Sequence, residues 1–385
     1  MFHFLTAGES HGKGLVAIVE GVPAGLALDE DYMARDLARR QKGYGRGARM
    51  KIEQDRAEII SGVRHGFTMG SPVSLLIWNR DWGNWKQVMS VAPVEQEVDV
   101  VTRLRPGHAD LAGAMKYDLD DVRNVLERAS ARETASRVAV GAVARKLLAE
   151  FDIGIYSHTI CIGGHWTKKA GKVDWAKVEK SPVRCADGKA EKAMLSTIDE
   201  AKKEGDTLGG VFEVVASGMP IGLGSHVHWE RRLDGRIAQA MMSINAVKGV
   251  EIGAGFNVAS LPGSQVHDII EFNAKDKWRH ATNRAGGIEG GMSNGEPIGI
   301  RVAVKPIPTL GKPLPSVDLR TGKTVEAHIE RSDICVVPAA GVIGEAMLAI
   351  VLAGAVLEKF GGDHIDETLR NYRSYLKTIG LKKTS

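Results

Sequence analysis

Hydrophobic and polar positions change their spacing several times along the chain, and each change predicts a different element. Residues 14–21 are short and rich in β-branched side chains, which favours a strand. Residues 31–40 place Met33 and Leu37 four positions apart among charged residues, which predicts a helix. Residues 120–151 are rich in alanine and predict one long helix that can pack closely against another.

The most apolar stretch runs from 339 to 360 and predicts a further helix. Glu345 and Glu358 enclose only twelve uncharged residues in it, whereas a membrane span needs roughly 20. We therefore expect a helix buried in the core of the protein. Residues 158–205, by contrast, are polar and rich in lysine, and we expect an irregular excursion at the periphery.

Two segments about half a chain apart are similar to each other. Residues 16–26 resemble residues 212–223, and each copy precedes a basic amphipathic helix candidate, at 31–40 and 231–244. The repeat predicts two similar strand–turn–helix halves packed in one domain. A chance match between two Gly/Pro turns is the alternative.

The composition favours an enzyme that acts on small anionic molecules. The net charge is +4 with a pI near 8.8, the arginines are dispersed, and aromatic residues make up 5%. This pattern disfavours a nucleic-acid surface. The three cysteines show no C-x-x-C spacing and the N-terminus lacks a secretion signal, so we expect a reduced, cytoplasmic protein.

Common cofactor and metal motifs are missing from the sequence. Gly322-Lys-Thr324 is not a Walker loop, because Val317 stands where the first glycine is required. No G-x-G-x-x-G enters a helix after a strand, which disfavours a Rossmann site. His226 and His228 have no evident carboxylate or thiol partner, so we expect no metal site.

Residues 8–12 read Gly-Glu-Ser-His-Gly, which admits two chemistries. The G-x-S-x-G spacing is that of a serine-hydrolase nucleophile elbow, which lies between a central strand and a helix. Only seven residues precede Gly8, and the segment that follows favours a strand. The alternative is a polar loop in which Ser10 and His11 act as hydrogen-bond and proton-transfer groups, and position in the chain favours it.

Residues 39–49 form an arginine-rich loop among glycines. Arg39, Arg40, Arg46 and Arg49 would repel one another without an anion between them. Glycine permits close backbone approach, and arginine offers paired donors for carboxylate or phosphate. We interpret the loop as an anion-binding segment, with a flexible exposed loop as the alternative.

Six segments, in the same order, resemble motifs of the chorismate synthase family, and the resemblance extends over nearly the whole chain. They are Gly8-Glu-Ser-His-Gly12, Arg105-Pro-Gly-His-Ala-Asp110, Glu127-Arg-Ala-Ser-Ala-Arg-Glu-Thr134, Ser243-Ile-Asn-Ala-Val-Lys-Gly249, Lys305-Pro-Ile-Pro-Thr309 and Arg331-Ser-Asp-Ile-Cys335.

This resemblance implies an α+β fold, in which residues 1–385 form a single-domain β-α-β sandwich with an internal pseudo-two-fold repeat. It implies a homotetrameric lyase that converts 5-enolpyruvylshikimate 3-phosphate to chorismate and phosphate by trans-1,4-elimination, the last common step toward the aromatic amino acids. The reaction requires reduced FMN without net redox change, and NADPH is a candidate reductant of that flavin. Neither nucleic acid nor a membrane is an implied partner.

The resemblance also implies roles for individual residues. His11 would protonate the departing phosphate, His108 would stabilise reduced flavin near N1, and Asp333 would help to move a proton at N5. The implied flavin-binding residues are Arg40, Arg46, Ser130, Ala131, Arg132, Asn245, Ala246, Gly290, Lys305, Pro306, Ile307, Pro308, Thr309 and Arg331. The implied substrate-binding residues are Ser10, Arg40, Arg49, Arg105, Arg132 and Arg331.

Each of these assignments has a plainer alternative in the sequence. His108 follows Pro-Gly and is also compatible with a simple turn. Asp333 is also compatible with an ion pair to Arg331. Residues 305–308 are also compatible with an extended connector, because each proline restricts the residue before it.

Overall fold

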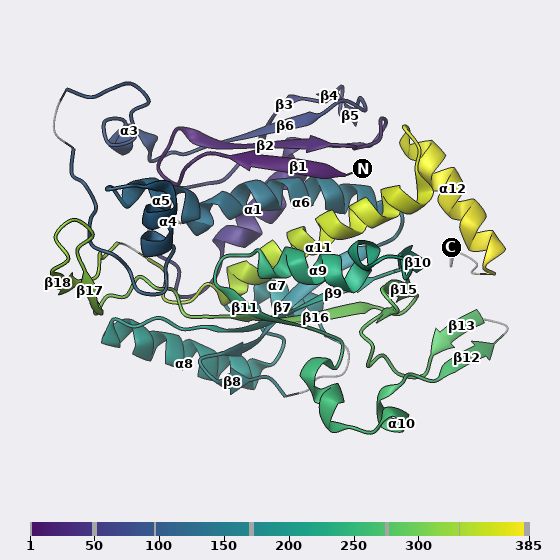
Figure 1. The fold of residues 1–385 in the computed structure, drawn as a ribbon. Coiled ribbons are helices and arrows are strands. Elements are labelled where there is room, and N and C mark those ends of the chain that lie inside the picture. Colours follow the sequence, from purple (N-terminus) through teal and green to yellow (C-terminus); the bar gives the residue numbers. More distant parts are fainter. Residues whose placement is uncertain are drawn as a thin grey trace.

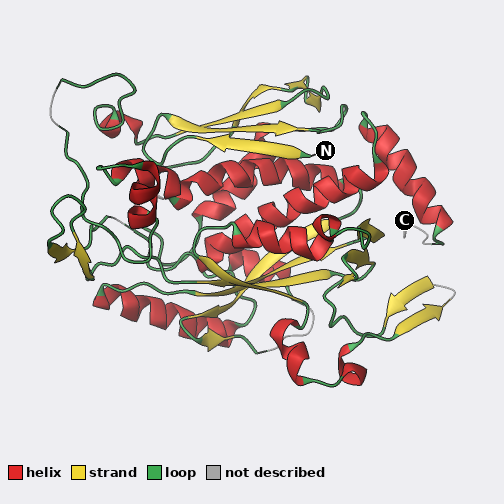
Figure 2. Ribbon diagram, in the orientation of Figure 1, coloured by secondary structure: helices red, strands yellow, loops and turns green. Residues whose placement is uncertain are grey.

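Two β-sheets enclose a layer of helices in the computed structural model of the chain (Figure 1). The structure describes residues 2–47, 52–95, 98–168, 173–273, 277–330 and 332–380. Figure 2 shows the helices in red between the two sets of yellow strands. The expected β-α-β sandwich is therefore confirmed.

The first sheet is antiparallel and has the strand order β1-β2-β6-β3. Its strands are β1 (His3–Ala7), β2 (Gly14–Glu20), β6 (Val73–Trp78) and β3 (Glu58–Ser61). Along β2 and β6 alternate side chains face the helices and are buried, as the two-residue period of a strand requires. The strand predicted at 14–21 is confirmed.

The second sheet has the order β11-β16-β9-β7-β8 and is also antiparallel. Its strands are β11 (Val247–Ile252), β16 (Ile298–Val304), β9 (Gly210–Ser217), β7 (Gly154–Ile162) and β8 (His165–Trp166). Apart from the short edge strand β8, its order in space reproduces that of the first sheet: β7, β9, β16 and β11 correspond to β1, β2, β6 and β3.

The helices between the sheets follow the same correspondence. In the first half, α1 (Glu30–Gln41) follows β2 and α6 (Thr134–Ala149) follows β6. In the second half, α9 (Leu233–Met242) follows β9 and α11 (Val337–Phe360) follows β16. The structure thus contains the two strand–turn–helix halves that the sequence repeat predicts, related by a pseudo-two-fold axis.

Helices α6 and α11 pack directly against each other in the centre of the molecule (Figure 1). A Cβ atom on Gly141 would lie 2.3 Å from the Cβ of Ala346, so a glycine is needed where the two backbones approach. The most apolar window of α11 is 100% buried inside the protein. The prediction of a buried core helix over 339–360 is therefore confirmed.

The prediction of one helix over 120–151 is wrong. Helix α5 (Arg123–Ala129) ends at Ser130, whose backbone is extended, and a 3₁₀ turn (Ala131–Glu133) precedes α6. The Ser130 hydroxyl accepts a hydrogen bond from the Arg132 N–H, which is the capping interaction that serines favour at a helix start. This cap overrides the helical preference of the neighbouring alanines.

The prediction of an irregular excursion over 158–205 is also wrong. After β7 and β8 the chain forms α7 (Trp175–Lys180) and α8 (Gly188–Glu204). Helix α8 begins at the cap Asp187 and buries residues 190, 194, 198 and 201 on one face. That helical period is visible in the sequence beneath the lysines of the opposite face.

Smaller elements complete the described fold. The remaining strands are β4 (Val63–Arg64), β5 (Phe67–Thr68), β10 (Ile221–Gly224), β12 (Ile270–Asn273), β13 (Lys277–His280), β14 (Ile288–Glu289), β15 (Met292–Asn294), β17 (Pro315–Val317) and β18 (Thr324–Glu326). The remaining helices are α3 (Trp82–Trp85), α4 (Asp110–Tyr117), α10 (Gly263–Val266), α12 (Ile365–Thr378) and the 3₁₀ turns Trp229–Arg231 and Gly255–Ser260.

Candidate functional site

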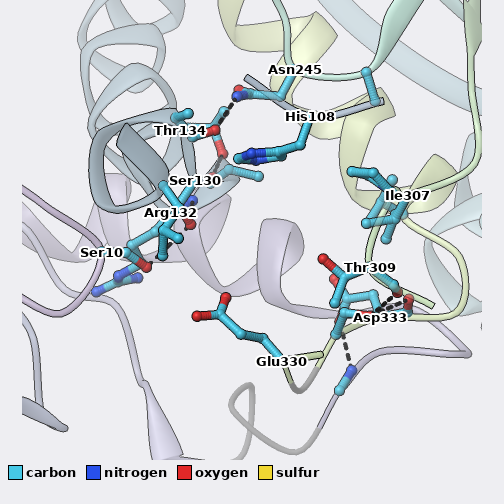
Figure 3. Close-up of a pocket in the computed structure, with 18 of the residues that line it drawn as sticks. Ser10, His108, Ser130, Arg132, Thr134, Asn245, Ile307, Thr309, Glu330 and Asp333 are labelled. Carbon is cyan, nitrogen blue, oxygen red and sulfur yellow. Dashed lines mark hydrogen bonds between the residues drawn. The ribbon is translucent and has the colours of Figure 1, made fainter. Parts of the chain in front are cut away.

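A cavity of about 460 Å³ lies at the end of the helical layer where α6 and α11 begin. Both halves line it, and Figure 3 shows Ser10, Ser130 and Arg132 on one wall with Thr309 and Asp333 across from them. Most of the predicted site residues line this cavity: Ser10, His11, Arg40, Arg46, Arg105, His108, Ser130, Ala131, Arg132, Asn245, Ala246, Lys305, Ile307, Pro308, Thr309 and Asp333.

The other four predicted residues are two that the structure does not describe and two that lie away from the cavity lining. Arg49 and Arg331 lie outside the described residues. Gly290 lies in the turn between β14 and β15, and Pro306 lies between two lining residues without lining the cavity itself.

The Gly8–Gly12 motif forms the turn between the antiparallel strands β1 and β2. A nucleophile elbow would lead into a helix, so the structure contradicts the hydrolase interpretation, whereas the roles of Ser10 and His11 stay predictions. The Ser10 hydroxyl accepts a hydrogen bond from the Ser130 hydroxyl at 3.1 Å. This bond ties the turn to the break between α5 and α6.

His11 is held by the carboxylate of Glu127. One oxygen accepts from the His11 backbone N–H at 2.7 Å, and the other lies 2.8 Å from Nδ1 of the imidazole. Because the buried Glu127 accepts a hydrogen bond from Nδ1, Nδ1 carries a proton. The other ring nitrogen, Nε2, is therefore not engaged by Glu127. Glu127 stands in a motif noted in the sequence, yet sequence analysis assigned it no role.

Asn79, immediately after β6, organises the same turn. Its side-chain NH₂ lies within 3.2 Å of the carbonyl oxygens of Glu9, Ser10 and Gly12. Its side-chain oxygen accepts from Nε of Arg132 at 2.9 Å. Sequence analysis missed this residue, and its place directly after the largely apolar residues 73–78 was the available signal.

Arg40 and Arg132 are buried side by side at the base of the cavity. Arg40 donates to Thr134 and to the carbonyl of Ala131, and both arginines contact Asp55. Burial lowers the pKa of Arg40 to about 10, against the attraction of Asp55, and the neighbouring positive charges act in the same direction. Arg132 also lies 3.6 Å from Glu53, so two carboxylates face the two arginines, but the buried Nη2 of Arg132 has no hydrogen-bond partner within the described residues and could donate to an anion.

Arg39 corrects the interpretation of the arginine loop. Its guanidinium does not line the cavity but pairs with Asp36, Glu179 and the buried Glu345 of α11, at 2.7–3.0 Å. Repulsion among the four arginines therefore does not require an anion at this position, because protein carboxylates neutralise Arg39. Arg40 and Arg46 remain at the cavity.

His108 forms a second acid–base group with Asp110 and Arg105. Its Nδ1 makes a short contact with Asp110 and lies 3.0 Å from the Arg105 guanidinium. Burial raises the pKa of Asp110, but the hydrogen bonds from His108 and Arg105 outweigh it and lower the pKa to about 2. Asp110 is therefore a fixed negative charge behind His108, which is more than a simple turn residue.

Asp333 sits on the opposite wall, facing the end of the arginine loop. One carboxylate oxygen accepts from the Gly47 N–H at 2.6 Å, and the other lies 3.1 Å from the Arg46 guanidinium. The described partner of Asp333 is thus Arg46, while the alternative partner Arg331 lies outside the described residues.

The loop after α9 and the segment after β16 close the cavity. Asn245 donates to the carbonyl of Ala129, while its buried Oδ1 has no hydrogen-bond partner within the described part of the chain. Ala246 has a left-handed backbone (φ 66°), a strained conformation that often marks a ligand-contacting loop. Lys305 donates to the carbonyl of Gly107, and burial, with help from Lys248, lowers its pKa.

The lining combines positive charge, acid–base groups and an apolar surface. The cations come from Arg40, Arg46, Arg105, Arg132 and Lys305, and the N-termini of α6 and α11 add their partial positive charges. The apolar surface is formed by Leu126, Ile244, Ile307, Val336, Ala339, Ala340 and Ile343. Such a cavity suits ligands that join a flat apolar ring to anionic groups.

Comparisons with known proteins find relatives that match nearly the whole chain. A model of the chorismate synthase family matches residues 2–357. A chorismate synthase of Moorella thermoacetica is 58% identical over 385 residues, covering 98% of this chain and 100% of the relative. One of Symbiobacterium thermophilum is 57% identical, with the same coverage. A solved structure, described as a crystal structure of chorismate synthase, is similar with a TM-score of 0.80 and 46% identity, covering 98% of each chain.

Proposed function

The chain belongs to the chorismate synthase family of lyases, and we propose that it converts 5-enolpyruvylshikimate 3-phosphate to chorismate and phosphate by trans-1,4-elimination. One observation carries this proposal. Two histidines, each backed by a buried carboxylate, share a cavity with the buried arginines Arg40, Arg105 and Arg132.

The arginines account for binding of a substrate with two carboxylates and a phosphate. Arg40, Arg105 and Arg132 are buried and held by protein acceptors, so their charges are fixed before any ligand enters. Together with Ser10 they form the described part of the proposed substrate-binding set. Arg49 and Arg331 belong to that set by resemblance.

His11 is proposed as the proton donor to the departing phosphate. Glu127 holds Nδ1, so the proton for transfer is carried on Nε2 when the ring is charged. The carboxylate orients the ring through Nδ1, and it also fixes the backbone of the turn through the His11 N–H. General acid catalysis of this kind supplies roughly 10²–10⁴ in rate.

The residues around the cavity fit a flavin. The unpaired Oδ1 of Asn245 offers an acceptor to a ring N–H, the apolar surface suits a flat ring system, and Lys305 and Arg46 suit a phosphate. When bound, reduced FMN supplies transient electron donation and finishes the cycle reduced. With flavin bound, His108, whose ring is oriented by Asp110, would hold a proton near N1, and Asp333 would help to move a proton at N5.

The test is an anaerobic assay with a limiting amount of chemically reduced FMN. We expect many chorismate molecules for each FMN, a flavin spectrum that ends in the reduced form, and no product with oxidised FMN alone. Flavin oxidation that tracks chorismate one for one would contradict the proposal, because the chain would then be an ordinary oxidoreductase. Adding NADPH with oxidised FMN tests whether the chain reduces its own flavin.

We further propose that residues 1–385 act as one domain and assemble as a cytoplasmic homotetramer. The large hydrophobic cluster that joins both sheets and the helices supports the single domain, and a small second cluster lies around Val101 and Leu126. Leu5 and Ile18, paired on the outer face of the first sheet, are 66% and 44% exposed, which supports burial of that face by another subunit. The free, buried cysteines Cys161, Cys185 and Cys335 support a reducing compartment.

A further inference from the structure

The indole ring of Trp85 stacks on the imidazole of His11. The two ring centroids are 3.8 Å apart and the ring planes meet at 24°. Trp85 lies in the short helix α3, and His11 lies in the turn between β1 and β2. Trp85 is absent from the sequence motifs and from the cavity lining, so neither signal points to it.

Trp85 is itself held in place by its neighbours. Its indole N–H donates to Asp81 at 3.0 Å, and Asp81 also accepts from the Asn84 side chain at 2.7 Å. The guanidinium carbon of Arg123 lies 5.2 Å from the centroid of the indole, which is within cation–π range. The indole therefore offers His11 a fixed surface.

Arg123 connects this stack to the other support of His11. Its guanidinium lies 3.4 Å from the Glu127 oxygen that faces His11 Nδ1. Arg123 thus contacts both groups that hold the imidazole: Glu127 at the ring edge and Trp85 at the ring face. A hydrogen bond at Nδ1 alone lets a ring pivot about that bond, whereas a second ring packed on its face blocks the pivot.

We propose that Trp85 is a positioning residue that holds Nε2 of His11 in its direction of proton transfer. This inference rests on the proposed role of His11 as the proton donor. Proton transfer requires hydrogen-bond distance and alignment, so a ring that pivots spends less time in the productive direction. Substrate binding relies on the arginines instead, so loss of Trp85 affects kcat and leaves KM nearly unchanged.

The test compares Trp85→Leu, Trp85→Phe and the control Trp82→Leu in the reduced-FMN assay. Trp82 lies in the same helix and makes no ring contact with His11 among the described residues. The interaction free energy of an aromatic pair, if it is lost from the productive orientation, corresponds to a roughly two- to tenfold lower rate. We expect kcat to fall by that factor in Trp85→Leu with KM within about twofold, to recover in Trp85→Phe, and to stay unchanged in Trp82→Leu.

An NMR measurement reports on the stack without catalysis. In the uncomplexed protein the Hε1 resonance of His11, assigned by its loss in His11→Ala, is expected upfield because the indole ring current acts on it. It should move toward the value of a free imidazole in Trp85→Leu but not in Trp82→Leu. An unmoved resonance in Trp85→Leu would overturn the inference.

The activity outcomes separate this inference from the proposed function. If Trp85→Leu keeps the wild-type kcat while His11→Ala loses turnover, only the positioning role of Trp85 is overturned. Full turnover in both variants overturns the proton-donor role of His11, and the positioning role with it.

Discussion

Replacing Glu345 with glutamine would remove one negative charge from an ion-pair network buried in the middle of the protein. Glu345 is fully buried in the most apolar helix, α11. Burial raises its pKa, but Arg39 and Arg145 outweigh that effect, so the pKa is lowered and the carboxylate stays charged. It accepts hydrogen bonds from Arg39, Arg145, Arg184 and the Ser157 hydroxyl.

The magnitude follows from the charges that remain. Three arginines are balanced by Glu345, Asp36 and Glu179. Glutamine leaves one positive charge in excess and turns an NH₂ group toward guanidinium donors. Removing one partner of a buried pair costs about 3–5 kcal/mol, and because Asp36 and Glu179 still contact the arginines we expect the lower end, about 3 kcal/mol.

The assay is thermal unfolding at neutral pH, with Glu358→Gln as the control. An unfolding entropy of about 2.1 cal/mol/K per residue gives roughly 0.8 kcal/mol/K for 385 residues, so 3 kcal/mol lowers Tm by about 4 °C. Glu358 is on the same helix and accepts from Arg236 at 2.7 Å, but it is 52% exposed. Its pair is worth about 1 kcal/mol or less, or about 1 °C. Equal Tm values for the two variants would refute the reasoning.

Three further predictions concern the site and the helix packing. In the reduced-FMN assay His11→Ala should lower the turnover rate by roughly 10²–10⁴-fold with flavin still bound. His3 is exposed, and the control His3→Ala should leave the turnover rate unchanged. A near-normal turnover rate in His11→Ala would show that His11 is not the proton donor. Gly141→Ala should lower Tm by about 1–4 °C, because the added Cβ would collide with α11 at a cost of about 1–3 kcal/mol. In the control Gly235→Ala the added Cβ meets no atom within 4 Å, so Tm should not fall. The pKa of Asp110 in the folded protein, about 2, lies below its ordinary value of 3.8, so the charged carboxylate stabilises the protein above about pH 4. This contribution to stability is lost as the pH falls toward 2, and the Tm difference between wild type and Asp110→Asn should therefore shrink between about pH 4 and about pH 2. A Tm difference that stays constant over this range would contradict the lowered pKa.

The sequence predicted those features that depend on local periodicity. The β-branched run of β2 and the helical spacing of α1 reflect burial of one face against the core, and the apolar length of α11 reflects burial on all sides. The break at Ser130 was missed because alanine-rich neighbours favour a helix. The hydroxyl of Ser130 instead caps a turn and bonds to Ser10, which is 120 positions away.

Residues 39 and 40 show a second limit of sequence analysis. They are adjacent, so spacing assigned them to one anion-binding loop. A helix separates neighbouring side chains by about 100°, so Arg39 turns to Glu345 while Arg40 turns to the cavity. Glu127, Asn79 and Trp85 were missed for a related reason, because their partners lie in a turn that only the folded chain brings beside them.

Both halves of the internal repeat line the same cavity, and this shared site accounts for the faintness of the repeat. Equivalent segments of the two halves face each other across one ligand site, yet the proposed substrate has no two-fold symmetry. Each pair of equivalent positions therefore had to diverge: the end of α1 contributes Arg40 and Arg46, whereas the end of α9 contributes Asn245 and Ala246. Two identical halves could form only a symmetric site. Because both halves belong to one chain, each could acquire different residues at the site. Their similarity persists mainly in the strands that build the scaffold.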